Sequence, residues 1–141
     1  LHHIVFGTRN RECTIPADSK RALFAYIHGI IKSKDCKLHR INGMEDHIHI
    51  LADINPTISL ADFVKTIKQS SSYWMKHNPD FNLFDGWAKG YYAFSLSRDE
   101  IEKCRNYIIN QEKHHSITGF IDETKELAMI NGVEWHHQDW I

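Results

Sequence analysis

The stretch CKLHRINGMEDHIHILADI, residues 36–54, predicts a β-hairpin around which the rest of the fold can be built. Its two halves, Cys36–Ile41 and His47–Ile54, contain the apolar and β-branched residues that strands favour. Asn42-Gly43 lies between them and is a typical turn signal of a hairpin. The stretch therefore predicts two neighbouring antiparallel strands.

Two histidines of this hairpin and two residues of a later helix form a candidate metal site. Side chains alternate along a strand, so His47 and His49 point to the same face and can converge on one cation. Tyr107 and Gln111 are spaced i, i+4, which places them on one face of a helix. By helical angle, that face borders the apolar packing side of the helix. Such a site could move a phosphodiester onto tyrosine.

The remaining elements follow from period 2 for strands and period 3.6 for helices. In chain order they are a strand at His2–Thr8, a helix after Pro16, the hairpin, a helix capped by Ser59, a strand at Tyr91–Leu96 and a helix opened by Ser97 and Glu100. This βαββαβ order predicts an α+β fold, a ferredoxin-like or RRM-like antiparallel sheet with helices on one face, plus a C-terminal helix that carries Tyr107. The first and third strands are expected to be central. The face opposite the helices is expected to be open to a substrate or a second subunit.

Length and composition predict one domain. The chain has 141 residues, of which 42% are hydrophobic, enough for one core and too little for two. A formal net charge of −1 neither demands nor excludes a nucleic-acid partner, so any DNA contact must use a local basic face. Three cysteines without CxxC spacing argue against a disulfide framework and favour a reducing cytoplasm. No apolar run approaches the length of a membrane span.

DNA strand transfer needs the residue types of this site. A phosphodiester resists attack because its non-bridging oxygens are negative, and a divalent ion neutralises that charge. Imidazoles with an amide oxygen form a ligand set that tolerates Mg²⁺ or Mn²⁺. Tyrosine is a weak nucleophile at neutral pH. Its advantage is reversibility, because a DNA 3′-hydroxyl can attack the phosphotyrosine bond and rejoin the strand.

Four segments occur together in an order that one known family uses. They are HIVFGTR at residues 3–9, EDHIHIL at 45–51, FDGWAKGYY at 84–92 and YIINQEKHH at 107–115. These resemble the opening strand, the histidine–hydrophobe–histidine (HUH) motif, the tryptophan–glycine–tyrosine segment and the nucleophile helix of the HUH-type single-tyrosine transposases. That family serves small bacterial insertion sequences and includes relatives associated with repetitive extragenic palindromes. The similarity runs from about residue 1 to residue 115.

The resemblance implies a metal-dependent transposase that nicks and rejoins single-stranded DNA through a 5′-phosphotyrosine intermediate. By motif match, His47, His49 and Gln111 would hold the divalent metal, Mg²⁺ or Mn²⁺, and Tyr107 would be the catalytic nucleophile. The resemblance also implies a homodimer that recognises DNA hairpins at the ends of a mobile element, with a tyrosine helix that can complete the partner's site. Residues 1–141 are then a single domain, with a core at 1–115 and a C-terminal extension at 116–141.

A local basic surface is expected to bind the DNA. The candidates are Arg9, Arg11, Lys65, Lys68 and Lys76, with Trp87 stacking on an unpaired base. The lysines could instead solvate an amphipathic helix, and Trp87 could instead pack in the core. Four other histidines are expected to be bystanders, namely His2, His3, His136 and His137.

Other functional classes fit the pattern less well. A nucleotide hydrolase of the histidine-triad kind needs a third histidine two residues beyond His49, where this chain has Leu51. A two-histidine phosphoesterase needs a pair of HxT or HxS motifs, and His49 is followed by Ile50 and Leu51 instead. A noncatalytic nucleic-acid-binding module on the same fold, including a domesticated or inactive transposase relative, remains the open alternative.

Overall fold

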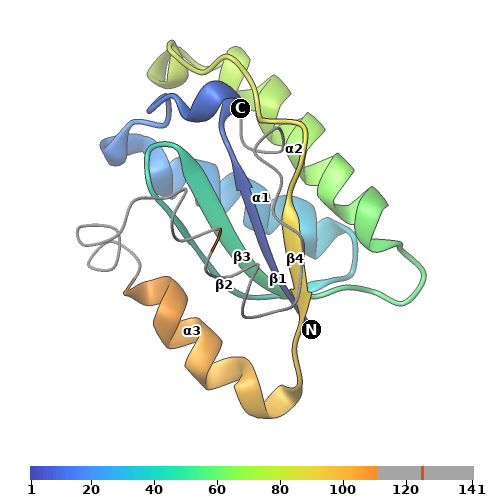
Figure 1. Ribbon diagram of the computed structural model, residues 1–141. Coiled ribbons are helices and arrows are strands. Elements are labelled where there is room, and N and C mark those ends of the chain that lie inside the picture. Colours follow the sequence, from blue (N-terminus) through green and yellow to red (C-terminus); the bar gives the residue numbers. More distant parts are fainter. Residues whose placement is uncertain (111–124, 126–141) are drawn as a thin grey trace.

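The chain forms a four-stranded antiparallel sheet with helices on both of its faces (Figure 1). The computed structural model describes residues 1–110 and Lys125. The strands are β1 (His2–Gly7), β2 (Lys37–Gly43), β3 (His47–Asp53) and β4 (Tyr92–Ser95), and the helices are α1 (Lys20–Ser33), α2 (Leu60–Lys76) and α3 (Ile101–Ile109). This order of elements confirms the predicted α+β fold. None of the helices in the described part of the chain is long and apolar enough to cross a lipid bilayer.

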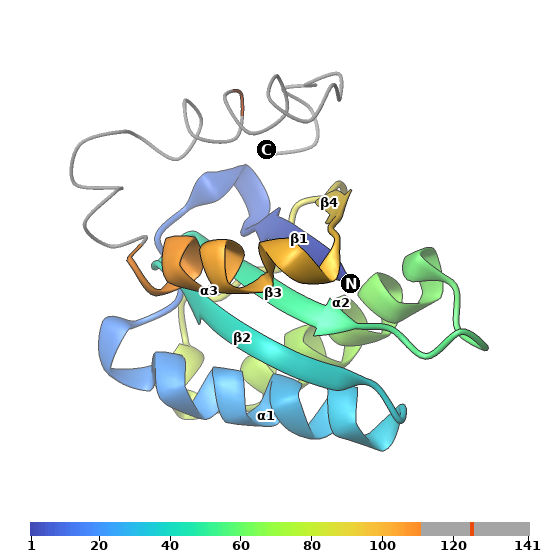
Figure 2. The same cartoon turned by 90° about the horizontal axis from the view of Figure 1, so that it is seen from below.

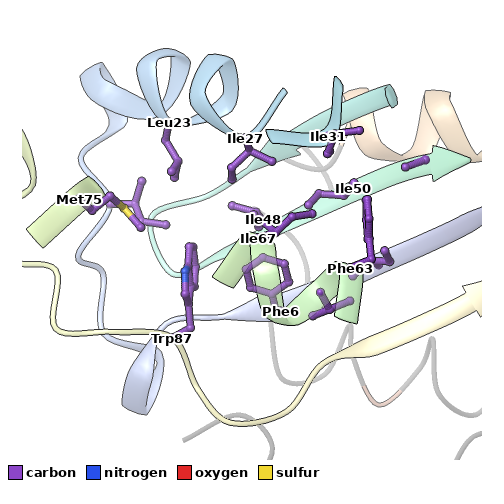
Figure 3. Close-up of a cluster of buried hydrophobic side chains, with 14 of the residues drawn as sticks. Phe6, Leu23, Ile27, Ile31, Ile48, Ile50, Phe63, Ile67, Met75 and Trp87 are labelled. Carbon is purple, nitrogen blue, oxygen red and sulfur yellow. The ribbon is translucent and has the colours of Figure 1, made fainter. Parts of the chain in front are cut away.

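The main core lies between the sheet and the helices α1 and α2, which cover one of its faces (Figure 3). The strand order is β2-β3-β1-β4, so β1 and β3 are central, as predicted. Buried side chains meet in this layer from α1 (Leu23, Ile27), α2 (Ile67) and β3 (Ile48, Ile50). Burying one such aliphatic side chain contributes about 1.5–3 kcal/mol. The layer therefore holds β3 firmly in the middle of the sheet.

The third helix, α3, packs against the opposite face of the sheet (Figure 2). Cys104 and Ile108 are buried against Leu51 of β3, in an apolar cluster separate from the main core. The prediction of an open face is therefore wrong where α3 lies. The physical reason is that Leu51 follows His49 by two residues, so this face of β3 is apolar at one end and also needs a cover.

The hairpin turn lies later in the chain than predicted. Asn42 and Gly43 belong to β2, and residues 44–46 make the connection to β3. The amide N–H of Met44 donates to the carbonyl oxygen of His47 at 3.0 Å. Gly43 is required beside this contact because a Cβ atom there would lie 2.5 Å from the same oxygen. Gly43 thus allows the backbones of β2 and β3 to approach each other closely at this point.

Candidate active site

His47 and His49 project from one face of the central strand β3. Their ring centroids are 5.2 Å apart, with the ring planes at 76°. Both side chains are buried, at 1% and 0% exposure. His49 pairs with Asn42 of β2 on one side and with Val5 of β1 on the other. A strand that is bonded along both edges gives a pair of ligands a rigid support.

Each of these histidines uses its Nδ1 atom for a contact with a neighbouring side chain. Nδ1 of His47 lies 2.7 Å from Oδ1 of Asp46. Nδ1 of His49 lies 2.9 Å from Nε2 of His3 on β1. Metal-binding histidines almost always engage their second ring nitrogen in this way, because the bond fixes the tautomer and the ring orientation. The contacts leave Nε2 as the atom of each ring that is suited to a metal.

His3, which was expected to be a bystander, lies in direct contact with the candidate site. It is 4% exposed, and its ring stacks on that of His49 with centroids 5.1 Å apart. Burial lowers the pKa of His3 to about 4, so the side chain is neutral at pH 7. The pairing of Val5 with His49 places His3 diagonally across from that histidine. No local signal in the sequence marks His3, because its contact with His49 depends on the register between β1 and β3.

Tyr107 lies on α3, next to these rings. Its ring centroid is 5.9 Å from that of His49 and 6.0 Å from that of His3. Tyr107 is half-buried, whereas its neighbour Ile108 is fully buried. This is the border position expected from the helical angle. Gln111, the other helix residue of the predicted site, lies outside the described residues.

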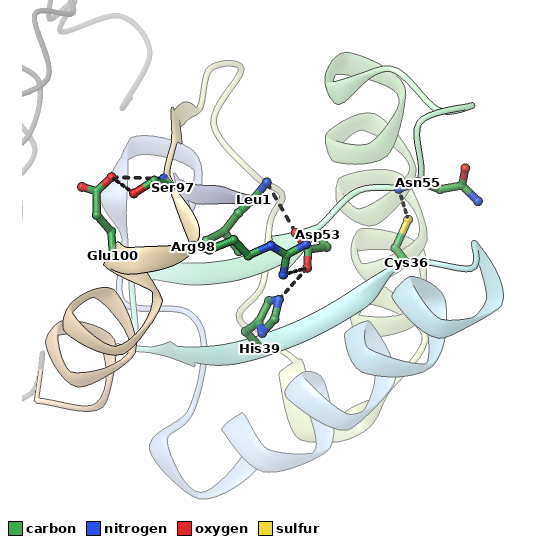
Figure 4. Close-up of polar contacts among 8 residues, drawn as sticks. All are labelled: Leu1, Cys36, His39, Asp53, Asn55, Ser97, Arg98 and Glu100. Carbon is green, nitrogen blue, oxygen red and sulfur yellow. Dashed lines mark hydrogen bonds and ion pairs between the residues drawn. The ribbon is translucent and has the colours of Figure 1, made fainter.

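A polar cluster fixes the start of α3 to the end of β3 (Figure 4). Oδ2 of Asp53 accepts hydrogen bonds from Arg98 at 3.0 Å and from His39 at 2.8 Å. Burial alone would raise the pKa of Asp53, but the His39 hydrogen bond and the Arg98 charge outweigh it and lower that pKa. Ser97 and Glu100 form the predicted capping box at the short 3-10 helix Arg98–Glu100, which leads directly into α3.

The end of α3 is fixed to β2. Nδ2 of Asn42 donates to the carbonyl oxygen of Ile108 at 3.1 Å. This carbonyl is one of the last four of the helix, which have no partner within the helix itself. The contact satisfies it and brings α3 close to β3. With both ends held, the helix presents Tyr107 beside the histidines.

The side chains of the site fit the imidazole part of a divalent metal centre. His47 and His49 converge on one face, and each has its Nδ1 atom engaged. Across residues 1–110 and Lys125, no group of three or more His, Cys, Asp or Glu side chains is placed to hold a metal ion. The third expected ligand, Gln111, lies outside the residues that the structure describes. A complete ligand set therefore needs an oxygen donor beyond these two rings.

A basic groove runs along α2 and the loop that precedes β4, and we call it the α2 groove. Its volume is about 510 Å³, and four residues predicted to bind DNA line it, namely Arg9, Lys68, Lys76 and Trp87. Other residues that were not predicted to bind DNA also line it, among them Tyr73, His77 and Lys89. Lys65 lines an adjoining hollow of about 250 Å³. Arg11 is not among the lining residues of either hollow.

Two of these predicted DNA-binding residues hold the groove together. Trp87 is 8% exposed, packs edge-on against Phe6 at 4.8 Å and donates from Nε1 to Oγ of Ser71 at 3.0 Å. The indole is therefore in the core and is not exposed for base stacking. Lys68 donates from Nζ to the carbonyl oxygens of residues 88–90, at 2.6–3.2 Å. Its ammonium group thus fastens the loop to α2.

Most of the chain matches a known protein family. The family model described as "Transposase IS200 like" matches residues 1–111. The chain belongs to the IS200-like transposase family. Its members are tyrosine transposases, so this IS200-like transposase is an enzyme of DNA strand cleavage and transfer.

Individual relatives agree with this membership. The IS200-like transposase is 25% identical, over 115 residues, to the transposases for insertion sequence element IS200 of Salmonella typhimurium and Salmonella typhi, with 78% of this chain and 75% of each relative covered. A crystal structure of a putative transposase from Deinococcus radiodurans R1 matches with a TM-score of 0.58 and 22% identity, over 78% of this chain and 88% of that chain. A REP-associated tyrosine transposase bound to a REP hairpin matches with a TM-score of 0.64 and 12% identity, over 99% and 84%. At these identities the two structures show a shared fold.

Proposed function

We propose that this transposase nicks and rejoins single-stranded DNA through a 5′-phosphotyrosine on Tyr107, with a divalent metal held by His47 and His49. The observation that carries the proposal is the position of the Tyr107 ring, 5.9 Å from that of His49 and near the face where both histidines project. Gln111 is the third proposed ligand, because it follows Tyr107 by about one helical turn in the sequence.

Tyr107 acts in this proposal as a covalent nucleophile. Its phenolic oxygen forms a bond to the scissile phosphorus while the bond from phosphorus to the 3′-oxygen breaks. The phenolic proton passes through solvent to the departing 3′-oxygen, so one hydroxyl is lost and one is formed. The phosphodiester is conserved as a phosphotyrosine, and a DNA 3′-hydroxyl can reverse the step and join a strand.

His47 and His49 would bind the metal through Nε2, because each Nδ1 atom is engaged by a neighbouring side chain. When bound there, Mg²⁺ or Mn²⁺ would supply positive charge to offset the negative charge of the phosphate and of the departing oxygen. The contribution of the protein is to hold two imidazoles on a rigid strand and to aim the phenol of Tyr107 from α3.

Covalent capture of the DNA tests this proposal. A panel of 3′-labelled single-stranded DNA hairpins is incubated with Mn²⁺ and the protein and separated by denaturing electrophoresis. We expect a protein-linked strand that is absent with Tyr107→Phe and with a chelator. Tyr26→Phe, which also removes one phenolic hydroxyl but lies on α1, should retain it. Hairpin binding without any adduct would overturn the proposal in favour of a noncatalytic module.

The DNA partner is proposed to be hairpin-containing single-stranded DNA, bound along the α2 groove. Arg9, Lys76 and Lys89 supply positive charge to the groove, and Lys65 extends it. Tyr73 is 68% exposed and offers a flat ring to an unpaired base. The REP-associated structural relative is bound to a REP hairpin, which supports a hairpin as the ligand here.

The working form is proposed to be a cytoplasmic homodimer. The free state of Cys13, Cys36 and Cys104 supports a reducing compartment. The contacts of Tyr107 with His49 lie within one chain. Each subunit is therefore proposed to build its site from its own tyrosine and histidines, although the resemblance also allowed a shared site.

A further inference from the structure

The contact between His3 and His49 joins two buried rings on the two central strands. Nε2 of His3 lies 2.9 Å from Nδ1 of His49, and the side chains are 4% and 0% exposed. The rings also stack, with an angle of 28° between their planes. A hydrogen bond between two imidazole nitrogens needs one donor and one acceptor. The proton position on one ring therefore dictates the proton position on the other.

A metal-binding role for His49 decides which ring donates. Its Nδ1 atom is engaged by His3, so Nε2 is the atom for the metal. A neutral imidazole that binds a metal through Nε2 carries its proton on Nδ1. His49 must then donate, and Nε2 of His3 must accept. His47 is held in the same way by the carboxylate of Asp46.

We propose that His3 is a positioning residue that fixes the tautomer and the orientation of His49, so that Nε2 of His49 faces the metal. The proposal rests on the proposed function, because it requires His49 to be a ligand. Phe94 and Tyr107 contact the His3 ring edge-on, at centroid distances of 5.9 and 6.0 Å. These neighbours, together with the stack on His49, restrain the rotation of the His3 ring.

The choice of histidine as the acceptor has a chemical reason. The more usual partner of a metal-binding histidine is a carboxylate or a carbonyl oxygen. A carboxylate at position 3 would place negative charge next to Tyr107, where a phosphodiester must approach. An imidazole accepts the same hydrogen bond without adding that charge. It thus orients His49 and leaves the attack of Tyr107 on a phosphate unopposed.

Imidazole NMR tests the proton positions in the wild-type protein. Long-range ¹H–¹⁵N correlation spectra of the full-length, metal-free, histidine-labelled protein at pH 7 report which nitrogen of each ring carries hydrogen. We expect the Nδ1–H form for His49, with spectra of His3→Gln and His49→Gln giving the assignments. The Nε2–H form at His49 would overturn the proposal. The proton position is read in the wild-type protein, and the variants serve only to assign the signals.

Manganese affinity tests the consequence for the metal. Titration of the full-length, DNA-free protein with Mn²⁺ is expected to show binding weakened by about 10- to 100-fold in His3→Phe. His3→Gln should recover most of the affinity, because its amide oxygen can accept from Nδ1–H. His28→Phe, the same substitution at an exposed position on α1, should bind Mn²⁺ like the wild type. Thermal melts verify that each variant is folded.

Unchanged affinity in a folded His3→Phe protein would overturn the proposal, as would a His3→Gln protein no better than His3→Phe. His49→Ala separates this failure from failure of the proposed function. If His49→Ala still binds Mn²⁺ like the wild type, the metal site itself is wrong. If His49→Ala loses the metal but His3→Phe keeps it, only the positioning role of His3 is wrong.

Discussion

Burial of His3 among aromatic rings gives this residue an effect on stability that depends on pH. Its pKa falls from 6.5 to about 4 in the folded chain because burial disfavours the charged ring. Between these values the unfolded chain binds a proton that the folded chain does not. The contribution of His3 to the pH dependence is therefore as follows. The free energy of unfolding is at its full value above pH 6.5, and it decreases progressively as the pH falls towards 4.

We expect the free energy of unfolding of the metal-free protein to fall by roughly 2 kcal/mol between pH 6.5 and pH 5, at about 1.4 kcal/mol per pH unit. Urea unfolding at several pH values measures it. His3→Phe should reduce this dependence, whereas His28→Gln, at an exposed position on α1, should not. The same pH dependence in wild type and His3→Phe would show that His3 is not the group responsible.

Only part of this local chemistry can be predicted from the sequence. The spacing of His47 and His49 is a local pattern, and so is the helical position of Tyr107. His3 meets His49 across a sequence separation of 46 residues, so the contact depends on strand register. Trp87 is a similar case, because its pairing with Thr8 draws the indole over the core. Neither contact leaves a mark in the neighbouring sequence.

Among the elements, β2 shows why local signals can misplace a boundary. The order of strands and helices, the central strands and the two helix starts follow from periodicity and capping residues. Asn42 was expected in a turn, but it is the β2 residue that pairs with His49 and holds the end of α3. The role of Asn42 depends on a helix that follows much later in the chain. Turn preferences are local, so they carry no information about that helix.

Asn42→Ala should loosen α3. The change leaves the Ile108 carbonyl without this donor, so we expect a loss of about 1 kcal/mol of stability. Amide exchange should accelerate in α3 more than in α2, and adduct formation should slow because Tyr107 is held less firmly. Asn78→Ala, which removes a cap on another short helix, is the matched control. Equal acceleration of exchange in α2 and α3 would argue against a local anchor.

In the whole molecule, the end of β1 connects the α2 groove to the histidine site. Gly7 pairs with His47 of β3, and the next residue, Thr8, bridges to Trp87 in the groove loop. Neighbouring strands lie about 4.8 Å apart, so the loop and β3 are separated by roughly 10 Å. We therefore expect DNA in the groove to pass around this end of the sheet towards Tyr107.

The α2 groove predicts a salt-dependent affinity for DNA. Lys76→Ala should weaken hairpin binding similarly for different sequences and reduce the slope of log K against log salt by about 1. Lys32→Ala, at an exposed position on α1, serves as the control and should leave the slope unchanged. The test is fluorescence anisotropy over a range of salt concentrations. An unchanged slope for Lys76→Ala would exclude this lysine as a phosphate contact.

Mixing two inactive variants tests whether one subunit builds a whole site. His49→Ala keeps its tyrosine, and Tyr107→Phe keeps its histidines. Because Tyr107 contacts His49 of its own chain, we expect the mixture to form no adduct even when mixed dimers are present. Recovery of adduct in the mixture, measured by denaturing electrophoresis, would mean that the tyrosine of one subunit acts with the histidines of another.

Mass spectrometry of the trapped adduct tests the central claim most directly. After nuclease and trypsin digestion, Tyr107 lies in the peptide NYIINQEK, residues 106–113. The expected result is that this peptide carries the 5′-phosphate of the cleaved strand on Tyr107. Attachment to any other residue, or cleavage of the strand with no nucleotide left on the protein, would contradict the account.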